Sequence, residues 1–223
     1  MTRSPFLENI MPRYADLRDD LKTGDILLFA GEDKFSRGIR LVTGGDWSHI
    51  AMVVVLELPG EQTMVAAWES TTLSPVKDLW SGKEHKGVSL VSLSDRVAKQ
   101  VGRIAVRPLS DPIDEPMEAA LWEARKLMAR RPYERDFIEL AKSAYDGPFG
   151  ANREDLSSVF CSELVAEAYQ GMALLPDVED GGPPSNEYTP RDFSTSALHP
   201  LELLNGYELL DELEIETGPA SVH

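Results

Sequence analysis

The chain has 223 residues, of which 42% are hydrophobic and 27% charged, and its formal net charge is −16. This length and balance are typical of one globular domain with a sizeable core, and we expect a single domain over residues 1–223. A nucleic-acid partner is not expected, because so acidic a chain cannot neutralise phosphates over a broad surface. The same charge predicts no association with anionic membranes and favours a small-molecule or peptide substrate that bears an amine.

The first half of the chain reads as strands broken by turns. Short apolar or β-branched runs predict strands over 24–29, 48–57 and 63–70, with a turn at Pro59-Gly60 and a short helix over 34–43 that ends at Gly44-Gly45. Further along, VSLVSL predicts a strand and LSDRVAKQ a short helix, and 103–108 a further strand. We treat residues 1–20 as an N-terminal extension.

The second half is richer in helical patterns. An amphipathic helix is expected over 114–130, with Asp114 as N-cap and Pro116 in its first turn, followed by helices over 134–144 and 160–172. The Gly/Pro-rich stretch 176–194 reads as a long loop of the kind that forms lids, and 207–217 as a last strand. Strands first and helices later predict an α+β fold in which helices pack on one side of an antiparallel sheet.

Cys161 is the single cysteine of the chain, so no intrachain disulfide is possible. We place it at or near the first turn of the helix over 160–172. A helix N-terminus carries partial positive charge and unpaired N–H groups, which would stabilise a thiolate and the oxyanion formed when that thiolate attacks a carbonyl. The alternative is a small buried apolar residue.

His49 and Glu69 complete a candidate triad with Cys161. His49 begins the strand at 48–57, and Glu69 interrupts the apolar return strand. With a turn at Pro59 or Gly60, the two residues lie directly or diagonally opposite and share a face of the sheet, and a one-residue slip would separate them. Glu69 would then fix the tautomer of His49, whose other ring nitrogen would accept the thiol proton.

Neighbouring side chains are candidates for substrate binding. Trp47 and Ser48 flank the base, Tyr133 follows the helix over 114–130, and Tyr188 lies in the expected lid. The structural alternative is core packing for Trp47 and Ser48, a surface aromatic for Tyr133 and an ordered loop for Tyr188. The N-terminus shows no secretory or transit signal and no stretch is apolar enough for a membrane helix, so a cytoplasmic location is expected.

The pattern resembles the permuted papain-like branch of the NlpC-type peptidase superfamily, close to the YiiX-like amidases and more distantly similar to lecithin–retinol acyltransferase. The matching pieces span residues 20–195 and are GDILLF at 24–29, WSHIAMVV at 47–54, WEST at 68–71, FCSELVAEAY at 160–169 and NEYTPRDFS at 186–194. The resemblance implies a circularly permuted papain-like fold, with Cys161 as nucleophile, His49 as base and Glu69 as third polar residue.

The activity implied by the resemblance is hydrolysis of a small amide or peptide, peptidoglycan-derived peptides among them, through an acyl-enzyme. No metal or cofactor is expected. Two other interpretations stay open: a thiol acyltransferase or esterase acting on lipids, and a module without catalysis in which Cys161, His49 and Glu69 hold zinc. The oligomeric state is open.

Overall fold

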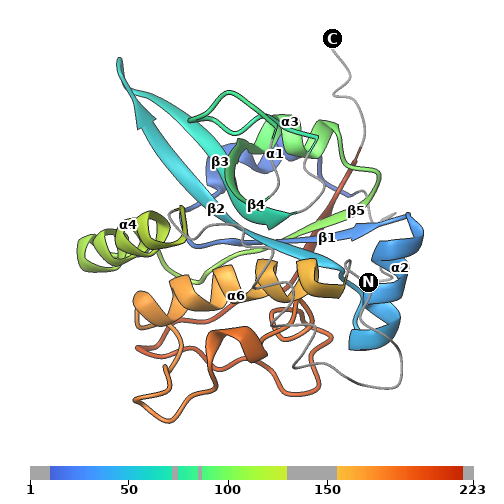
Figure 1. Cartoon of the computed structure of the whole chain (residues 1–223). Helices are drawn as coiled ribbons and strands as arrows, with labels where there is room; N and C mark the ends of the chain where they lie inside the picture. Colours follow the sequence, from blue (N-terminus) through green and yellow to red (C-terminus); the bar gives the residue numbers. More distant parts are fainter. Residues whose placement is uncertain (1–10, 72–74, 85–86, 130–154, 218–223) are drawn as a thin grey trace, which may run out of the picture.

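A computed structural model describes residues 11–71, 75–84, 87–129 and 155–217 (Figure 1). Its strands are β1 (Ile26–Gly31), β2 (His49–Leu58), β3 (Gln62–Thr71), β4 (Gly87–Ser92), β5 (Gly102–Arg107) and β6 (Leu213–Ile215). Its helices are α1 (Tyr14–Leu17), α2 (Lys34–Thr43), α3 (Leu93–Ala98), α4 (Glu115–Ala129) and α6 (Asp155–Gly171), with short 3-10 turns η1 (Arg18–Asp20) and η2 (Ser185–Glu187). The helix expected over 134–144 lies outside the described residues.

The strands form one six-stranded sheet in the order β4-β3-β2-β1-β5-β6, and every neighbouring pair is antiparallel. The fold is therefore α+β with an antiparallel sheet, as the sequence predicts. β1 lies inside the sheet and its first five residues are buried. The last strand is much shorter than expected, because only Leu213–Ile215 of the stretch 207–217 pair with β5.

Helices cover both faces of the sheet, which corrects the expectation of helices on one side. Figure 1 shows α4 and α6 below the sheet and α1 and α3 above it. Leu28, Ile50 and Met52 pack in the core shared with α6, whereas Leu27 and Ala51 belong to the second core, beneath α3. The physical reason is that β1 and β2 are apolar at consecutive positions, so both of their faces require cover.

The β2–β3 hairpin has the register on which the candidate site depends. Leu58 pairs with Gln62, and Ala51 pairs with Glu69. The connection is Pro59-Gly60-Glu61, in which Gly60 and Glu61 have positive φ angles of 85° and 60°. This register makes His49 the diagonal neighbour of Glu69, which is one of the two arrangements the sequence predicts.

Of the remaining elements, α2 lies beside the end of β2 that carries His49 (Figure 1). α2 begins at its N-cap Asp33, whose side chain accepts a hydrogen bond from the backbone N–H of Ser36, and it ends at Gly44 in the left-handed conformation with φ 63°. Asp114 caps α4 as expected, accepting from the backbone N–H of Met117 at 2.9 Å. Tyr14 and Leu17 of the N-terminal segment pack against the core beneath α3.

The stretch 176–194 packs against α6. Tyr188 and Phe193 are buried in the α6 core, and the backbone carbonyl of Tyr188 accepts a hydrogen bond from Ser162 Oγ at 2.5 Å.

Among the described helices, none combines the length and the apolar composition needed to cross a membrane.

Candidate active site

His49 is the first residue of β2 and lies at the rim of the sheet. It pairs with Phe29 of β1, and the two rings are 5.4 Å apart between centroids. Its side chain keeps 15% of its surface exposed. A histidine at a strand end is held by the sheet on one side while its ring still meets solvent, so the ring can come within hydrogen-bond reach of a ligand.

Glu69 on β3 is the hydrogen-bond partner of His49. Its side chain is completely buried, and Oε2 lies 2.8 Å from Nε2 of His49. An ionised carboxylate only accepts hydrogen bonds, so Nε2 carries the proton and donates it. Because Nε2 faces Glu69, Nδ1 is the nitrogen that remains for a second partner.

Arg96 on α3 is a member of the site that the sequence reasoning missed. Its Nε donates to Oε2 of Glu69 at 3.1 Å, and its guanidinium stacks 4.3 Å above the ring centroid of Phe29. Nη1 donates to Oε1 of Gln100 at 2.7 Å. Glu69 therefore has a cation on one side and an imidazole on the other. The available signal was Glu69 itself, since a buried carboxylate needs a counter-charge.

Cys161 approaches the same imidazole from the other layer of the protein. It lies on α6 and belongs to the α6 core, yet its thiol is a hydrogen-bond partner of the His49 ring. Glu69 and Arg96 lie on the α3 side, because Glu69 pairs with Ala51 and Arg96 stacks on Phe29. His49 thus connects a sulfur on one side of the sheet to a carboxylate on the other.

The position of Cys161 within its helix corrects the sequence prediction. α6 begins at Asp155, so Cys161 is the seventh residue of the helix and not part of its first turn. No glycine or proline interrupts 155–160, and an acidic residue at the first position is favourable there, so the helix extends back beyond the apolar stretch. The free N–H groups of a helix N-terminus are consequently not beside the sulfur, and the partner of the thiol is His49.

The pKa values of the two buried partners shift in opposite directions. Burial disfavours the imidazolium, but attraction and hydrogen bonding to Cys161, together with the bond to Glu69, outweigh it and raise the pKa of His49 to about 9. Burial would raise the pKa of Glu69, but the Arg96 cation and the bond from His49 outweigh it and lower that pKa to about 2. At neutral pH the site therefore holds an imidazolium next to a carboxylate.

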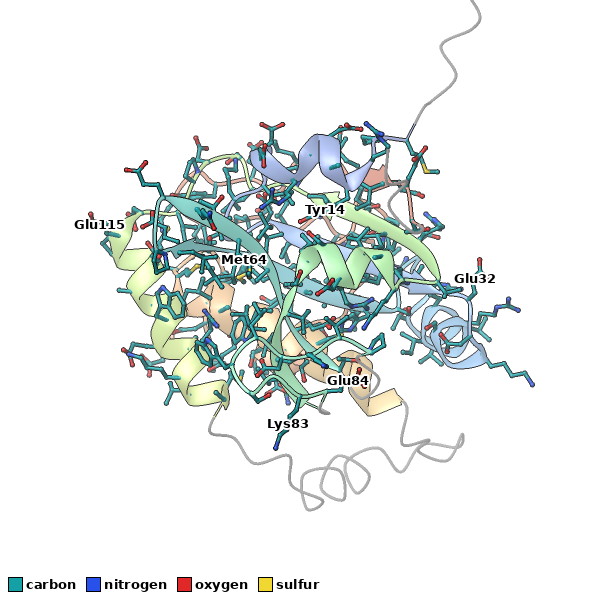
Figure 2. All side chains as sticks on the ribbon, turned by 90° about the horizontal axis from the view of Figure 1, so that it is seen from above. Tyr14, Glu32, Met64, Lys83, Glu84 and Glu115 are labelled. Carbon is teal, nitrogen blue, oxygen red and sulfur yellow. The ribbon has the colours of Figure 1, made fainter. Side chains whose placement is uncertain are left out.

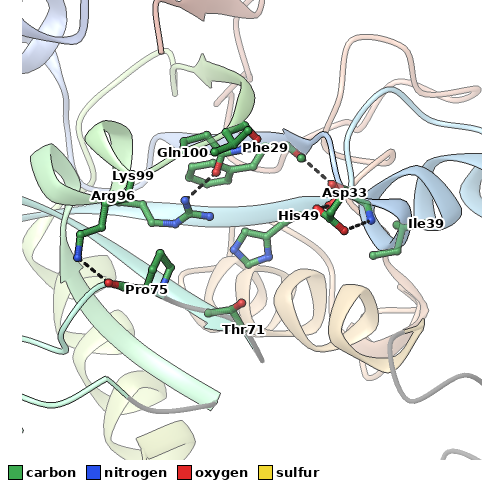
Figure 3. A pocket seen from close by; sticks show the side chains of 13 residues that line it. Phe29, Asp33, Ile39, His49, Thr71, Pro75, Arg96, Lys99 and Gln100 are labelled. Atoms are coloured by element: carbon green, nitrogen blue, oxygen red, sulfur yellow. Dashed lines mark hydrogen bonds between the residues drawn. The ribbon is translucent and has the colours of Figure 1, made fainter. Parts of the chain in front are cut away.

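A pocket of about 210 Å³ opens beside His49 (Figure 3). Its lining comes from β1, the start of β2, the end of β3, α2 and α3, and includes Ser48, one of the predicted substrate-binding residues. The hydroxyl of Ser48 donates to the backbone carbonyl of Phe29 at 3.2 Å. This bond ties the residue before β2 to β1 in the wall of the pocket. Cys161 is fully buried and does not line this pocket; a ligand in it meets the imidazole first.

Two other predicted binding residues lie elsewhere. Trp47 is completely buried, and its Nε1 donates to Oε2 of Glu212 at 3.1 Å while Arg103 stacks over its ring. Tyr188 is buried against Phe193 on the α6 side, with 5.8 Å between ring centroids. Neither lines the pocket beside His49. Tyr133 lies outside the described residues.

Metal-binding geometry is not found within the described ranges, where no group of three or more histidine, cysteine and acidic residues is arranged to hold an ion. Of the three residues considered as zinc ligands, two are hydrogen-bonded to each other: Nε2 of His49 bonds to Oε2 of Glu69. The Arg96 cation lies 3.1 Å from that oxygen.

Comparison with known proteins gives one likeness to report. The crystal structure of metalloprotein yiiX from Escherichia coli O157:H7 matches at 21% sequence identity and a TM-score of 0.43, over 68% of this chain and 66% of that one, just under two thirds of that protein's length. No protein-family model matches, and no curated protein matches.

Proposed function

We propose that this protein is a cysteine-dependent hydrolase that cleaves a small amide, peptide or ester through an acyl-enzyme on Cys161. The observation that carries the proposal is the hydrogen-bonded series Cys161–His49–Glu69, in which one imidazole contacts both a thiol and a buried carboxylate. Such an arrangement activates a thiol and orients its base at the same time. The histidine strand preceding the cysteine helix is also the order of a permuted papain-like fold, which we include in the proposal.

The chemistry follows from the two nitrogens of His49. The thiol proton already rests on Nδ1 as part of the imidazolium, and the Cys161 thiolate adds to the carbonyl carbon of the substrate. The imidazolium then returns its proton to the leaving amine or alcohol as the carbon–nitrogen or carbon–oxygen bond breaks, which leaves a thioester on Cys161. Water, deprotonated by His49, attacks the thioester, which releases the carboxylic acid and restores the Cys161 thiolate beside the imidazolium. Glu69 keeps the ring in one orientation throughout, and in one tautomer whenever the ring is neutral.

Arg96 and Phe29 support this assignment. The Arg96 cation keeps Glu69 ionised in a buried environment, and the Phe29 ring lies against both the guanidinium and the imidazole. A water-poor surrounding strengthens each of these charge interactions. The proposal also requires that Cys161, buried in this structure, becomes accessible to reagents in the native protein.

Thiol labelling tests the nucleophile directly, because Cys161 is the single cysteine of the chain. Iodoacetamide is added to the native protein at pH 6, and the modified fraction is followed by intact-mass spectrometry beside glutathione as a free thiol. We expect faster labelling than glutathione, and slower labelling in His49→Gln. Labelling of the native protein no faster than that of glutathione would overturn the nucleophilic role.

A substrate panel tests the reaction. Acyl p-nitroanilides, p-nitrophenyl esters and fatty-acyl esters are offered to the wild-type protein and to Cys161→Ala, with His199→Gln as a matched control. We expect thiol-dependent turnover of the short amides or esters and a thioester mass adduct. Transfer of fatty-acyl groups would assign the acyltransferase alternative instead, and one equivalent of zinc that is lost in Cys161→Ala would assign a metal-holding module.

A further inference from the structure

The α3 side of the pocket carries two cations. Arg96, Lys99 and Gln100 line it together, and their spacing of three and four residues places them on one side of the helix end. Figure 3 shows these side chains on one wall, with Asp33 and Ile39 on the opposite wall and His49 between them. A group bound against α3 therefore lies next to the imidazole.

The contacts of Arg96 use only part of its donor set. Nε is occupied by Glu69 and Nη1 by Gln100. A guanidinium has five N–H donors in a planar fork, so neither contact uses the N–H groups of Nη2. Because the plane of the guanidinium is fixed by Phe29 at 4.3 Å, these donors are held in place before any ligand arrives.

Lys99 adds a charge that the pocket does not neutralise. Its Nζ donates to the backbone carbonyl of Pro75 at 2.6 Å, and within the described part of the chain it forms no ion pair. An ammonium has three donors, and a neutral carbonyl satisfies one of them. In a chain with a net charge of −16, Lys99 therefore brings to the pocket wall a positive charge that no ion pair within the described residues offsets.

The acidic side chain on the opposite wall is committed to the fold. Asp33 caps α2, accepting from the backbone N–H of Ser36 at 2.9 Å through Oδ1 and from Ser36 Oγ at 2.7 Å through Oδ2. The pocket is therefore basic on the α3 side, although the protein as a whole is strongly acidic. Net charge acts at long range, whereas groups at contact distance decide which ligand is bound.

We propose that Lys99 and Arg96 form a carboxylate-binding subsite, so that the substrate is an acyl compound bearing a carboxylate close to the bond that is cleaved. The inference rests on the proposed function for the position of that bond, whereas binding of the carboxylate itself does not require turnover. Arg96 contributes the planar donors of Nη2 and Lys99 a point charge beside them.

Binding is measured in full-length Cys161→Ala, which cannot turn a ligand over by the proposed route. N-acetylglycine is the probe, N-acetylglycinamide is its neutral counterpart, and isothermal titration calorimetry at constant ionic strength is the measurement. We expect saturable binding of the acid, weakened about tenfold by adding Lys99→Met, retained with Lys99→Arg, and far weaker binding of the amide. Lys83→Met is the charge-matched control, since Lys83 lies on an exposed loop and points away from the molecule (Figure 2).

The outcomes separate this inference from the proposed function. Equal binding of acid and amide, no effect of Lys99→Met, or an equal effect of Lys83→Met would overturn the subsite. Selective binding of the acid without thiol-dependent turnover would leave the subsite standing and remove the hydrolase. Turnover that needs Cys161 but is equally fast with carboxylate and amide substrates would support the hydrolase and overturn the subsite.

Discussion

Nε2 of His49 lies 2.8 Å from Oε2 of Glu69, and these two residues come from neighbouring strands joined by a three-residue turn. The hairpin therefore places the orienting carboxylate by register alone. Cys161 reaches the same ring from α6, whose core lies on the other side of the sheet. At the rim of the sheet, the imidazole of His49 thus contacts groups from both layers of the protein. The role of each group can be tested through its effect on the pKa of His49.

Replacing Glu69 by Gln removes the negative charge and nearly preserves the shape. Without the carboxylate the imidazolium loses a favourable partner, so the pKa of His49 falls. We expect kcat for any substrate found to drop on the order of 10²-fold, with the alkaline limb of the pH–rate profile moving to lower pH. An unchanged alkaline limb would show that Glu69 does not act on the titrating ring.

Replacing Cys161 by Ala tests the other contact of His49. Attraction to Cys161 is the leading cause that raises the imidazole pKa above its ordinary value of 6.5 toward about 9, so this substitution lowers it. Titration of the histidine Cε1 protons by NMR measures the shift, with His49→Gln to assign the signal and His199 as an internal reference. A His49 signal that titrates identically with and without Cys161 would contradict the contact.

The free energy of unfolding should depend on pH through the same pair. The folded pKa of His49 is raised, so its contribution to stability is complete below pH 6.5 and is lost as pH rises through about 9. The folded pKa of Glu69 is lowered, so its contribution is complete above pH 4.5 and is lost as pH falls toward 2. Urea unfolding from pH 6.5 to 10 should show declining stability, with a shallower decline in His49→Gln.

Trp47 is predicted to bind substrate because it is close to His49 in the sequence, but the structure places it in the core. It precedes the base by two residues, but its ring is completely buried and its N–H bonds to Glu212. Trp47→Phe should therefore lower the free energy of unfolding by about 1–3 kcal/mol through the lost bond and volume. KM for a substrate should stay at the wild-type value; a raised KM at unchanged stability would place Trp47 in the binding site after all.

The sequence predicts the hairpin and its histidine–glutamate pair because both are local. A Pro-Gly turn and two strands with a fixed side-chain period leave few registers, and one slip would reverse every face. The helix over 34–43 is equally local, with an acidic N-cap at Asp33 and a glycine after its end. Such features depend on a dozen neighbouring residues and on little else in the protein.

Features that depend on distant segments were not predicted. Arg96 is 27 residues from Glu69, and although its short helix is predicted, nothing in its neighbours marks it as the counter-charge. The second helical layer was also missed, although the consecutive apolar residues of β1 are typical of a strand buried on both faces. The sequence places the start of α6 five residues late, at 160 instead of 155, because an apolar pattern marks the buried part of a helix and not its beginning.

Arg96 and Glu69 provide the last test, through a double-mutant cycle. Glu69 is fully buried, so Arg96→Met leaves its carboxylate with the His49 ring but without the guanidinium and should cost about 1–3 kcal/mol of stability. Arg96→Lys keeps the charge but not the planar donors, and should restore part of that loss. In the Glu69→Gln background Arg96→Met should cost much less, because the buried negative charge is gone. Additive effects in urea unfolding would mean that the two side chains stabilise the fold independently, and that α3 does not hold the carboxylate against His49.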